Sequence, residues 1–252
     1  MPTMDTQHEE AMAAAAGGGE EKREYVQRIF SEIAPRYDLL NHLLSLNIDR
    51  RWRRVALAHL NWQRTPEGRY LDLCAGTLDL SVELARRAGF HGSVIGADFA
   101  EPMLRAGRSK AEGLRVSPVV ADALQLPIAD ASCDGAMVSF GVRNLADLDA
   151  GLREMHRVLV PGARAVILEF STPSSAPMRA LYHTYFHFVL PSIGRLVSGH
   201  PTAYRYLPKS VANFPTGDEL ATRMERAGFT NVAWSPLTFG IAAVHAGTKG
   251  AS

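Results

Sequence analysis

Residues 71–80, "LDLCAGTLDL", decide the fold. They join an apolar strand pattern to a helical pattern through a turn that contains Gly76, a junction typical of a parallel α/β sheet with ligands at the carboxyl ends of its strands. Asp72 and Asp79 flank the turn, where they could hold a positively charged or hydroxyl-rich ligand. The dinucleotide fingerprint G-x-G-x-x-G is absent, so a pyrophosphate cradle has poor support. Taken alone, the stretch could also be a tight turn without a ligand.

The alternation of strand and helix patterns continues after this turn. Apolar runs recur as "SVIGADF", "VSPVVADA", "CDGAMVSF" and "RAVILEF", with helical stretches between most of them. Continuous apolar strands separated by helices indicate a parallel sheet that is covered on both faces. The closing stretch "TNVAWSPLTFGIAAVHAGTK" predicts an antiparallel hairpin joined across Pro236 at the sheet edge. We therefore predict a doubly wound α/β fold.

Acidic residues end the first strands of this predicted sheet. Asp98 ends the strand that follows the turn, about 20 residues on, where it could accept hydrogen bonds from ribose hydroxyls. Asp122 ends the third strand, in "VVADALQLP". A single Asp in such a place is more often a helix N-cap. With Asp72, three successive strands each end in Asp, which is more than turns alone require.

Composition narrows the classes of protein further. The chain has 252 residues and a formal net charge of +1, so no global charge indicates a nucleic-acid partner. No run reaches the roughly 18 to 20 apolar residues of a membrane span, so any membrane contact is predicted to be peripheral. Cys74 and Cys133 lack metal-ligand spacing and fit a reducing compartment, which favours a cytoplasmic location.

We predict one domain over 23–252, preceded by a disordered tail over 1–22. Within the domain, 23–66 forms a helical lid and 173–214 an aromatic-rich insertion near the ligand site. His183 and His187 in this insertion have the i, i+4 spacing of two metal ligands, but no third ligand follows, so we predict no metal.

The stretch 37–54, "YDLLNHLLSLNIDRRWRR", combines a leucine stripe with a cluster of arginines. The stripe over 39–46 is predicted to cover the ligand pocket. The arginines are Arg50, Arg51, Arg53 and Arg54, which we expect to project around Trp52. They could form an ordinary solvated helix face, or they could attract anionic lipid headgroups.

These motifs resemble the ubiquinone/menaquinone biosynthesis C-methyltransferase family, the UbiE/MenG group. The similarity runs from about 25 to 249, and its most specific parts are "FSEIAPRYDLLNHLLSLNIDRRWR" and "SFGVRNLAD". The resemblance implies a class I methyltransferase with seven strands, S-adenosylmethionine as cofactor and a polyprenyl quinol as substrate. Demethylmenaquinol is the preferred acceptor, and the equivalent ubiquinone-pathway ring is the alternative. Two other functions stay open: an NAD-dependent oxidoreductase and a non-catalytic member of a quinone-synthesis complex. A homodimer also stays open.

The resemblance also implies roles for individual residues. Gly76 and Thr77 would line the methionine end of the cofactor, Asp98 would hold the ribose, and Asp122 with Ala123 would face adenine. The predicted cofactor-binding residues are Asp72, Gly76, Thr77, Asp98, Asp122, Ala123 and Ser139, the last of them near the sulfonium.

At the acceptor end, Arg143 is predicted to stabilise the phenolate form of the quinol, because arginine stays charged and presents a rigid donor fork. Asn144 would orient the same oxygen, although a surface loop is the plain alternative for "VRN". The predicted substrate-contacting residues are Tyr37, Asp38, His183 and Tyr185. For Tyr37 and Asp38 the alternative is ordinary helix capping after Pro35.

Leu78 departs from the family pattern, which usually has glycine after the threonine. We expect Leu78 to have right-handed helical backbone angles and to point into the core, with nearly normal cofactor affinity. The alternative is a bulkier cofactor wall and weaker binding.

Overall fold

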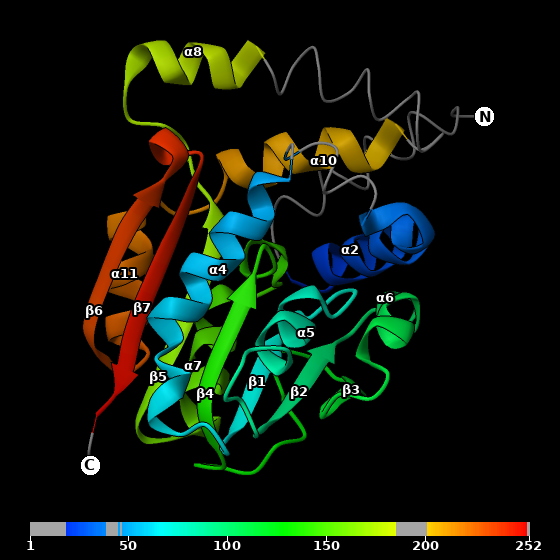
Figure 1. Cartoon of the computed structure of the whole chain (residues 1–252). Helices are drawn as coiled ribbons and strands as arrows, with labels where there is room; N and C mark the ends of the chain where they lie inside the picture. Colours follow the sequence, from blue (N-terminus) through cyan, green and yellow to red (C-terminus); the bar gives the residue numbers. More distant parts are fainter. Residues whose placement is uncertain (1–18, 39–44, 46, 185–200, 251–252) are drawn as a thin grey trace.

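A computed structural model describes residues 19–38, 45, 47–184 and 201–250. Its centre is a seven-stranded sheet in the order β3-β2-β1-β4-β5-β7-β6 (Figure 1). The strands are β1 (Arg69–Leu73), β2 (Ser93–Asp98), β3 (Val116–Val120), β4 (Cys133–Ser139), β5 (Leu159–Phe170), β6 (Phe229–Leu237) and β7 (Ala242–Lys249). Strands β1 to β5 pair in parallel and β7 pairs antiparallel with both β5 and β6. The predicted fold class is confirmed.

Helices and short 3-10 turns join and cover the strands. The α-helices are α2 (Gly19–Ile33), α4 (Ile48–Leu60), α5 (Asp79–Ala85), α6 (Glu101–Gly107), α7 (Leu148–Val158), α8 (Ala176–Thr184), α10 (Pro201–Ala212) and α11 (Gly217–Arg226). The 3-10 turns are η1 (Ala34–Arg36), η2 (Trp62–Arg64), η3 (Arg108–Ala111), η4 (Val142–Asn144) and η6 (Thr238–Gly240).

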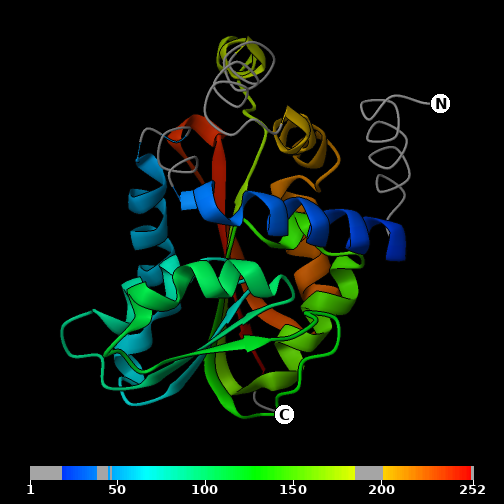
Figure 2. The same ribbon diagram turned by 90° about the vertical axis from the view of Figure 1, so that its right-hand side faces the viewer.

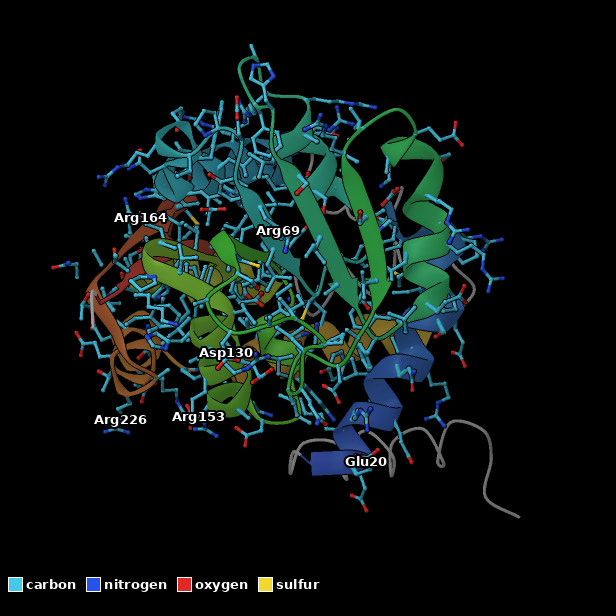
Figure 3. All side chains as sticks on the ribbon, turned by 90° about the horizontal axis from the view of Figure 1, so that it is seen from below. Glu20, Arg69, Asp130, Arg153, Arg164 and Arg226 are labelled. Carbon is cyan, nitrogen blue, oxygen red and sulfur yellow. The ribbon has the colours of Figure 1, made fainter. Side chains whose placement is uncertain are left out.

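The two faces of the sheet bury separate apolar clusters. Helices α4 and α5 cover one face, where Leu57 and Leu84 pack against Met137 of β4. Helices α7 and α11 cover the other face, where Met155 and Met224 are fully buried. Because both faces are buried, the strands read as continuous apolar runs. Charged side chains such as Arg153 and Arg226 lie at the periphery (Figure 3).

Helix α2 lies across the carboxyl-end edge of the sheet (Figure 2). Its apolar side buries Tyr25, Val26 and Ile29. Tyr25 meets the ring of Tyr206 from α10 edge to face, with centroids 5.7 Å apart. The amino-terminal segment therefore covers the edge of the sheet at which the ligand site is predicted, and its role as a lid stays a prediction.

Several details differ from the sequence prediction. Helix α2 begins at Gly19, inside the segment that we predicted as tail. Pro236 lies within the edge strand β6, and the hairpin turns instead at residues 238–240, which all have positive φ. Edge strands tolerate proline because the missing N–H can face solvent. Of the leucine stripe over 39–46, residues 39–44 and 46 lie outside the described residues. So do residues 185–200 of the predicted insertion over 173–214.

The four arginines of α4 do not share one surface. Arg50, Arg51 and Arg54 are exposed, but Arg53 is buried. Its guanidinium pairs with Asp49 at 2.6 Å and with Asp79 at 3.3 Å. The expectation for Arg53 was wrong, because its side chain points toward Asp79 at the start of α5 rather than toward solvent.

Candidate active site

The turn after β1 has an unusual backbone. Cys74, Gly76 and Leu78 have φ values of 54°, 53° and 65°, in the left-handed region. The turn closes with the Leu78 N–H donating to the Ala75 carbonyl at 2.8 Å. Glycine adopts this conformation at no steric cost, whereas the other two residues hold it at some cost in free energy. The left-handed residues thus turn the chain sharply at the carboxyl end of β1, where the predicted ligand site lies.

Leu78 stands where the family pattern usually has glycine, and its backbone and side chain show how leucine fits this position. The expected right-handed backbone is wrong, since φ is 65° and ψ is 18°. The expected direction of the side chain is confirmed, because Leu78 is fully buried with Val82 and Leu104. Burial of a leucine side chain is worth about 1.5 to 3 kcal/mol, which offsets about 1 to 2 kcal/mol for a left-handed backbone. Leu78 therefore leaves the cavity free.

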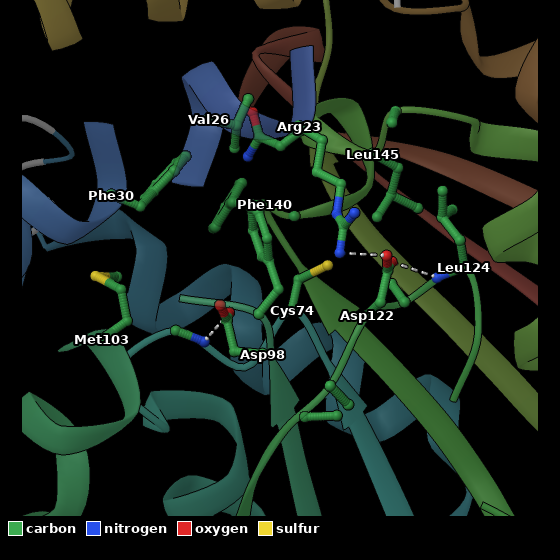
Figure 4. A pocket seen from close by; sticks show the side chains of 18 of the residues that line it. Arg23, Val26, Phe30, Cys74, Asp98, Met103, Asp122, Leu124, Phe140 and Leu145 are labelled. Carbon is green, nitrogen blue, oxygen red and sulfur yellow. Dashed lines mark hydrogen bonds and ion pairs between the residues drawn. The ribbon is translucent and has the colours of Figure 1, made fainter. Parts of the chain in front are cut away.

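A cavity of about 700 Å³, including its open mouth, lies above this turn (Figure 4). Its walls come from the loops that follow β1, β2, β3 and β4, and from α2 and the residues after it. Of the predicted site residues, those that line it are Tyr37, Gly76, Asp98, Asp122, Ala123, Ser139 and Asn144. The sequence pattern thus found most of the strand-end groups that share one cavity.

Asp98 lies in the wall of the cavity and accepts hydrogen bonds from the backbone. Its Oδ2 accepts a hydrogen bond from the Gly76 N–H at 2.8 Å, and its Oδ1 accepts one from the Ala100 N–H at 2.8 Å. Burial raises the pKa of Asp98, and these backbone donors oppose the rise. Because each carboxylate oxygen has two acceptor sites, Asp98 can take further hydrogen bonds from ligand hydroxyls.

Asp122 and Ser139 present polar atoms on other walls. Asp122 Oδ1 accepts from the Leu124 N–H at 2.9 Å, and its Oδ2 lies 3.1 Å from a guanidinium nitrogen of Arg23 on α2 (Figure 4). The hydroxyl of Ser139 is buried and has no hydrogen-bond partner among the described residues. Since a buried hydroxyl usually finds a partner, the Ser139 oxygen marks a place where a ligand atom can bind.

Thr77 and Asp38 lie beside the cavity rather than in its lining. Thr77 Oγ1 donates to Asp38 Oδ1 at 2.5 Å. Lys110 then donates to Asp38 Oδ2 at 2.7 Å and to Asp79 Oδ1 at 2.5 Å. This network ties the segment before α4 to the glycine turn and to η3. In the structure, Thr77 and Asp38 therefore hold the segment before α4 against the turn.

Asp72 also lies outside the cavity lining. It is buried in β1, and its Oδ2 accepts a hydrogen bond from Ser81 Oγ at 2.6 Å. Burial raises the pKa of Asp72 to about 7, although the hydrogen bonds from Ser81 oppose it. Its contacts hold the start of α5 against β1, which is a supporting role for the turn.

Arg143 in η4 is buried and paired. Its Nη1 donates to Glu169 Oε1 at 2.8 Å and to the Phe140 carbonyl at 2.5 Å. Its Nε donates to Ser210 Oγ at 3.3 Å, and the guanidinium lies 5.3 Å from the centroid of the Phe170 ring. Burial alone would lower the pKa of Arg143, but Glu169, Tyr37 and Tyr206 outweigh it and raise the pKa. Among the described residues, Nη2 has no hydrogen-bond partner. Arg143 does not line the cavity above the glycine turn and instead lines a second cavity against η4.

Glu169 is the residue that sequence reasoning missed. It is 1% exposed at the end of β5, and its Oε2 accepts a hydrogen bond from the Arg143 N–H at 3.3 Å. The Phe170 N–H donates to Oε1 at 2.8 Å. A single carboxylate in the apolar run "RAVILEF" was the available signal. A buried charge needs a partner, and Arg143 supplies it.

Tyr37 and Asn144 are the remaining predicted residues whose side chains the structure describes. Tyr37 packs against Phe30 with ring centroids 5.9 Å apart. Asn144 Oδ1 accepts a hydrogen bond from the Tyr206 hydroxyl at 3.1 Å. Burial raises the pKa of Tyr206 to about 12. His183 lies on α8 but its side chain is outside the described parts, as is all of Tyr185.

The part of the chain that the structure describes holds no group of three or more His, Cys, Asp or Glu side chains suited to a metal ion. The absence of a metal stays a prediction.

Comparison with known proteins adds to this geometry. Residues 18–249 match the ubiE/COQ5 methyltransferase family. The demethylmenaquinone methyltransferase of Thermus thermophilus is 50% identical over 223 residues, which cover 88% of this chain and 100% of that protein. The ubiquinone/menaquinone biosynthesis C-methyltransferase UbiE of Geobacter sulfurreducens is 45% identical over 234 residues, 91% of this chain and 90% of that protein.

Among solved structures, a methyltransferase of Thermotoga maritima that uses S-adenosylmethionine, described as a possible histamine N-methyltransferase, superposes with a TM-score of 0.59. It is 21% identical and covers 89% of this chain, with 99% of its own chain matched. At this identity the likeness concerns the fold.

Proposed function

Because the chain belongs to the ubiE/COQ5 methyltransferase family, we propose that it transfers the methyl group of S-adenosylmethionine to a ring carbon of a polyprenyl quinol. The family that the motifs predicted is confirmed, and the chain is an S-adenosylmethionine-dependent methyltransferase. Demethylmenaquinol is the proposed acceptor, since the relative from Thermus thermophilus is named for demethylmenaquinone. The relative from Geobacter sulfurreducens is named for both pathways, which keeps the benzoquinol ring as second candidate.

The cavity residues fit this cofactor. When bound, S-adenosylmethionine supplies an electrophilic methyl group on a sulfonium. Asp98 has free acceptor sites for the two ribose hydroxyls, and Asp122 with Ala123 lies on the wall that we assign to adenine. The unpartnered hydroxyl of Ser139 and the left-handed turn at Gly76 complete the wall that we assign to the methionine end.

The Arg143–Glu169 pair is the observation that carries the proposed acceptor chemistry. A quinol ring carbon becomes a nucleophile when the neighbouring hydroxyl loses its proton, so the site must favour the phenolate. Glu169 fixes one side of the guanidinium and leaves Nη2 for the phenolate oxygen. The buried carboxylate also keeps the pair neutral overall, so Arg143 acts through directed N–H donors more than through net charge.

We also propose peripheral contact with an anionic membrane surface. Arg50, Arg51 and Arg54 are exposed on α4, and Phe239 in the β6–β7 turn is 77% exposed. The Trp52 N–H of α4 donates to Thr238 Oγ1 at 2.8 Å, which joins the two features. A basic residue near an anionic surface contributes about 1 kcal/mol. None of the described helices is long and apolar enough to cross a membrane.

A liposome sedimentation assay tests this membrane contact. The triple variant Arg50→Gln, Arg51→Gln, Arg54→Gln should release much of the protein from vesicles that contain phosphatidylglycerol. Unchanged sedimentation would leave the arginines as an ordinary solvated helix face.

The methyl-transfer proposal is tested with labelled S-adenosylmethionine under reducing conditions. Short-chain demethylnaphthoquinol and demethoxy-benzoquinol are offered separately. We expect labelled product with the naphthoquinol. Labelled product with the benzoquinol alone would move the chain to the ubiquinone pathway, and no product with either ring would refute the proposal. Thermal protection by S-adenosylhomocysteine but not by NADH would exclude an NAD-dependent oxidoreductase.

A further inference from the structure

A second cavity lies against η4, on the side of Val142 and Leu148. It has a volume of about 850 Å³, including its open mouth. The elements that line it are α2, η4, the start of α7, α10, the segment that follows α10, and α11. Leu145 and Ala146 are shared with the cofactor cavity, so the two cavities lie on either side of the same turn.

The lining of this second cavity is strongly basic. Lys22, Lys209 and Arg223 reach it from three different helices, and none of the described residues that line it is acidic. Arg143 also lines it, with its charge balanced by Glu169. This is notable because the whole chain has a formal net charge of +1. Like charges repel, so helices that bring them together lose stability unless an anion is bound between them.

Two of these cations lack acidic partners in the described parts of the chain. The Lys22 ammonium donates a hydrogen bond to the Arg143 carbonyl at 3.0 Å. Burial, and then the nearby charge of Arg143, lower the pKa of Lys22. Lys209 is exposed and forms no ion pair with any residue that the structure describes. Arg223 pairs with Asp149 at 2.8 Å, but that carboxylate is not part of the lining.

The donors suit a phosphate group. Lysine ammonium groups and an arginine fork that approach from separate helices can bind several oxygens of one anion at once. The amide of Asn213 offers further donors at the same wall, and Phe214 and Leu148 supply apolar surface beside it. A neutral quinol ring would gain little from these cations.

We propose that this basic cavity binds a phosphate-bearing anion, either free in solution or as the headgroup of a lipid. The site shares Leu145 and Ala146 with the cofactor cavity and Arg143 with the proposed acceptor chemistry, but binding of a phosphate-bearing anion goes beyond methyl transfer. Its occupancy would act on η4 through Lys22, since that side chain holds the backbone of Arg143.

The test measures binding of pyrophosphate to the full chain by isothermal titration at constant ionic strength. The double variant Lys209→Gln, Arg223→Gln should raise the dissociation constant at least about tenfold, the loss expected from removing charge-assisted hydrogen bonds. The matched control is Arg153→Gln, Arg226→Gln, which removes the same charge from exposed positions of α7 and α11 outside the lining (Figure 3). The control should bind pyrophosphate like the wild type.

Sedimentation with vesicles that contain phosphatidylglycerol distinguishes the two sources. Loss of vesicle binding in the Lys209, Arg223 variant but not in the control assigns the site to a lipid headgroup. Loss of pyrophosphate binding without loss of vesicle binding assigns it to a free anion. Equal losses in both variants, or no binding of pyrophosphate by the wild type, would refute the proposal. Because the readout is binding, this result is independent of methyl transfer.

Discussion

The turn after β1 and the turn after β4 carry the two halves of the proposed site in different ways. The first relies on backbone conformation and local hydrogen bonds, with Asp98 accepting from the Gly76 N–H. The second relies on a buried charge pair, in which Arg143 meets Glu169 from the next strand. The comparison teaches that the cofactor half follows from short motifs, whereas the acceptor half depends on side chains brought together by the tertiary fold.

The largest effect should come from breaking the charge pair. Glu169→Ala leaves Arg143 buried without a carboxylate, so we expect the free energy of unfolding to fall by about 3 to 5 kcal/mol. Urea denaturation measures it. The matched control is Asp130→Ala, which removes the carboxylate from an exposed pair with Arg157 at 2.6 Å and should cost about 0 to 1 kcal/mol. Similar losses in both variants would remove the distinction between the two turns.

Substitutions in the cofactor half should weaken the binding of S-adenosylhomocysteine. Asp98→Ala removes the acceptors assigned to the ribose, so the dissociation constant of S-adenosylhomocysteine should rise about 10- to 100-fold. Calorimetry measures it. Asp98→Asn retains one oxygen and should lose less affinity, whereas Asp122→Ala, at a more exposed carboxylate, should lose less than about tenfold. An unchanged constant for Asp98→Ala would exclude the ribose role.

Asp72 should make the stability of the turn after β1 depend on pH. Its pKa in the folded state is about 7, above the unfolded value near 4, so the folded state binds more protons between these values. The contribution of Asp72 to stability therefore falls as pH rises through this window, by on the order of 1.4 kcal/mol per pKa unit. Asp72→Asn should lessen the decline between pH 5 and pH 8, measured as urea midpoints. Identical pH profiles for variant and wild type would contradict this.

Leu78 should affect the stability of the fold and leave cofactor affinity unchanged. Leu78→Gly relieves about 1 to 2 kcal/mol of backbone cost but loses more from the emptied core site, so a net loss of about 1 to 3 kcal/mol is expected. Leu78→Ala keeps the left-handed backbone cost and should be less stable than the glycine variant by about 1 kcal/mol. Affinity for S-adenosylhomocysteine should stay the same in both. Weaker binding would mean that Leu78 shapes the cofactor wall after all.

The sequence was sufficient for the sheet and for most of the cofactor cavity. Strand periodicity and the acids at strand ends are local, so Asp98 and Asp122 could be placed from neighbours in the chain. The backbone of Leu78 could not, because tertiary burial of its side chain sustains a conformation that local preference disfavours. Pro236 and Arg53 were misplaced for the same kind of reason, since edge position and ion pairing are properties of the fold.

The acceptor half was predictable only in part. "FGVRN" pointed to Arg143 and Asn144, but their partners Glu169, Tyr206 and Ser210 are distant in sequence. No pattern in one sequence pairs residues across such separations.

The central claim is that Arg143 acts on the acceptor and leaves the cofactor untouched. The double variant Arg143→Met, Glu169→Gln leaves no buried charge unpaired, so it should fold. Its single-turnover rate of methyl transfer at saturating S-adenosylmethionine should fall at least about 100-fold, since one preorganised donor at an oxyanion is worth about 3 kcal/mol. Affinity for S-adenosylhomocysteine should barely change. A rate close to that of the wild type, or a loss confined to cofactor binding, would contradict the account.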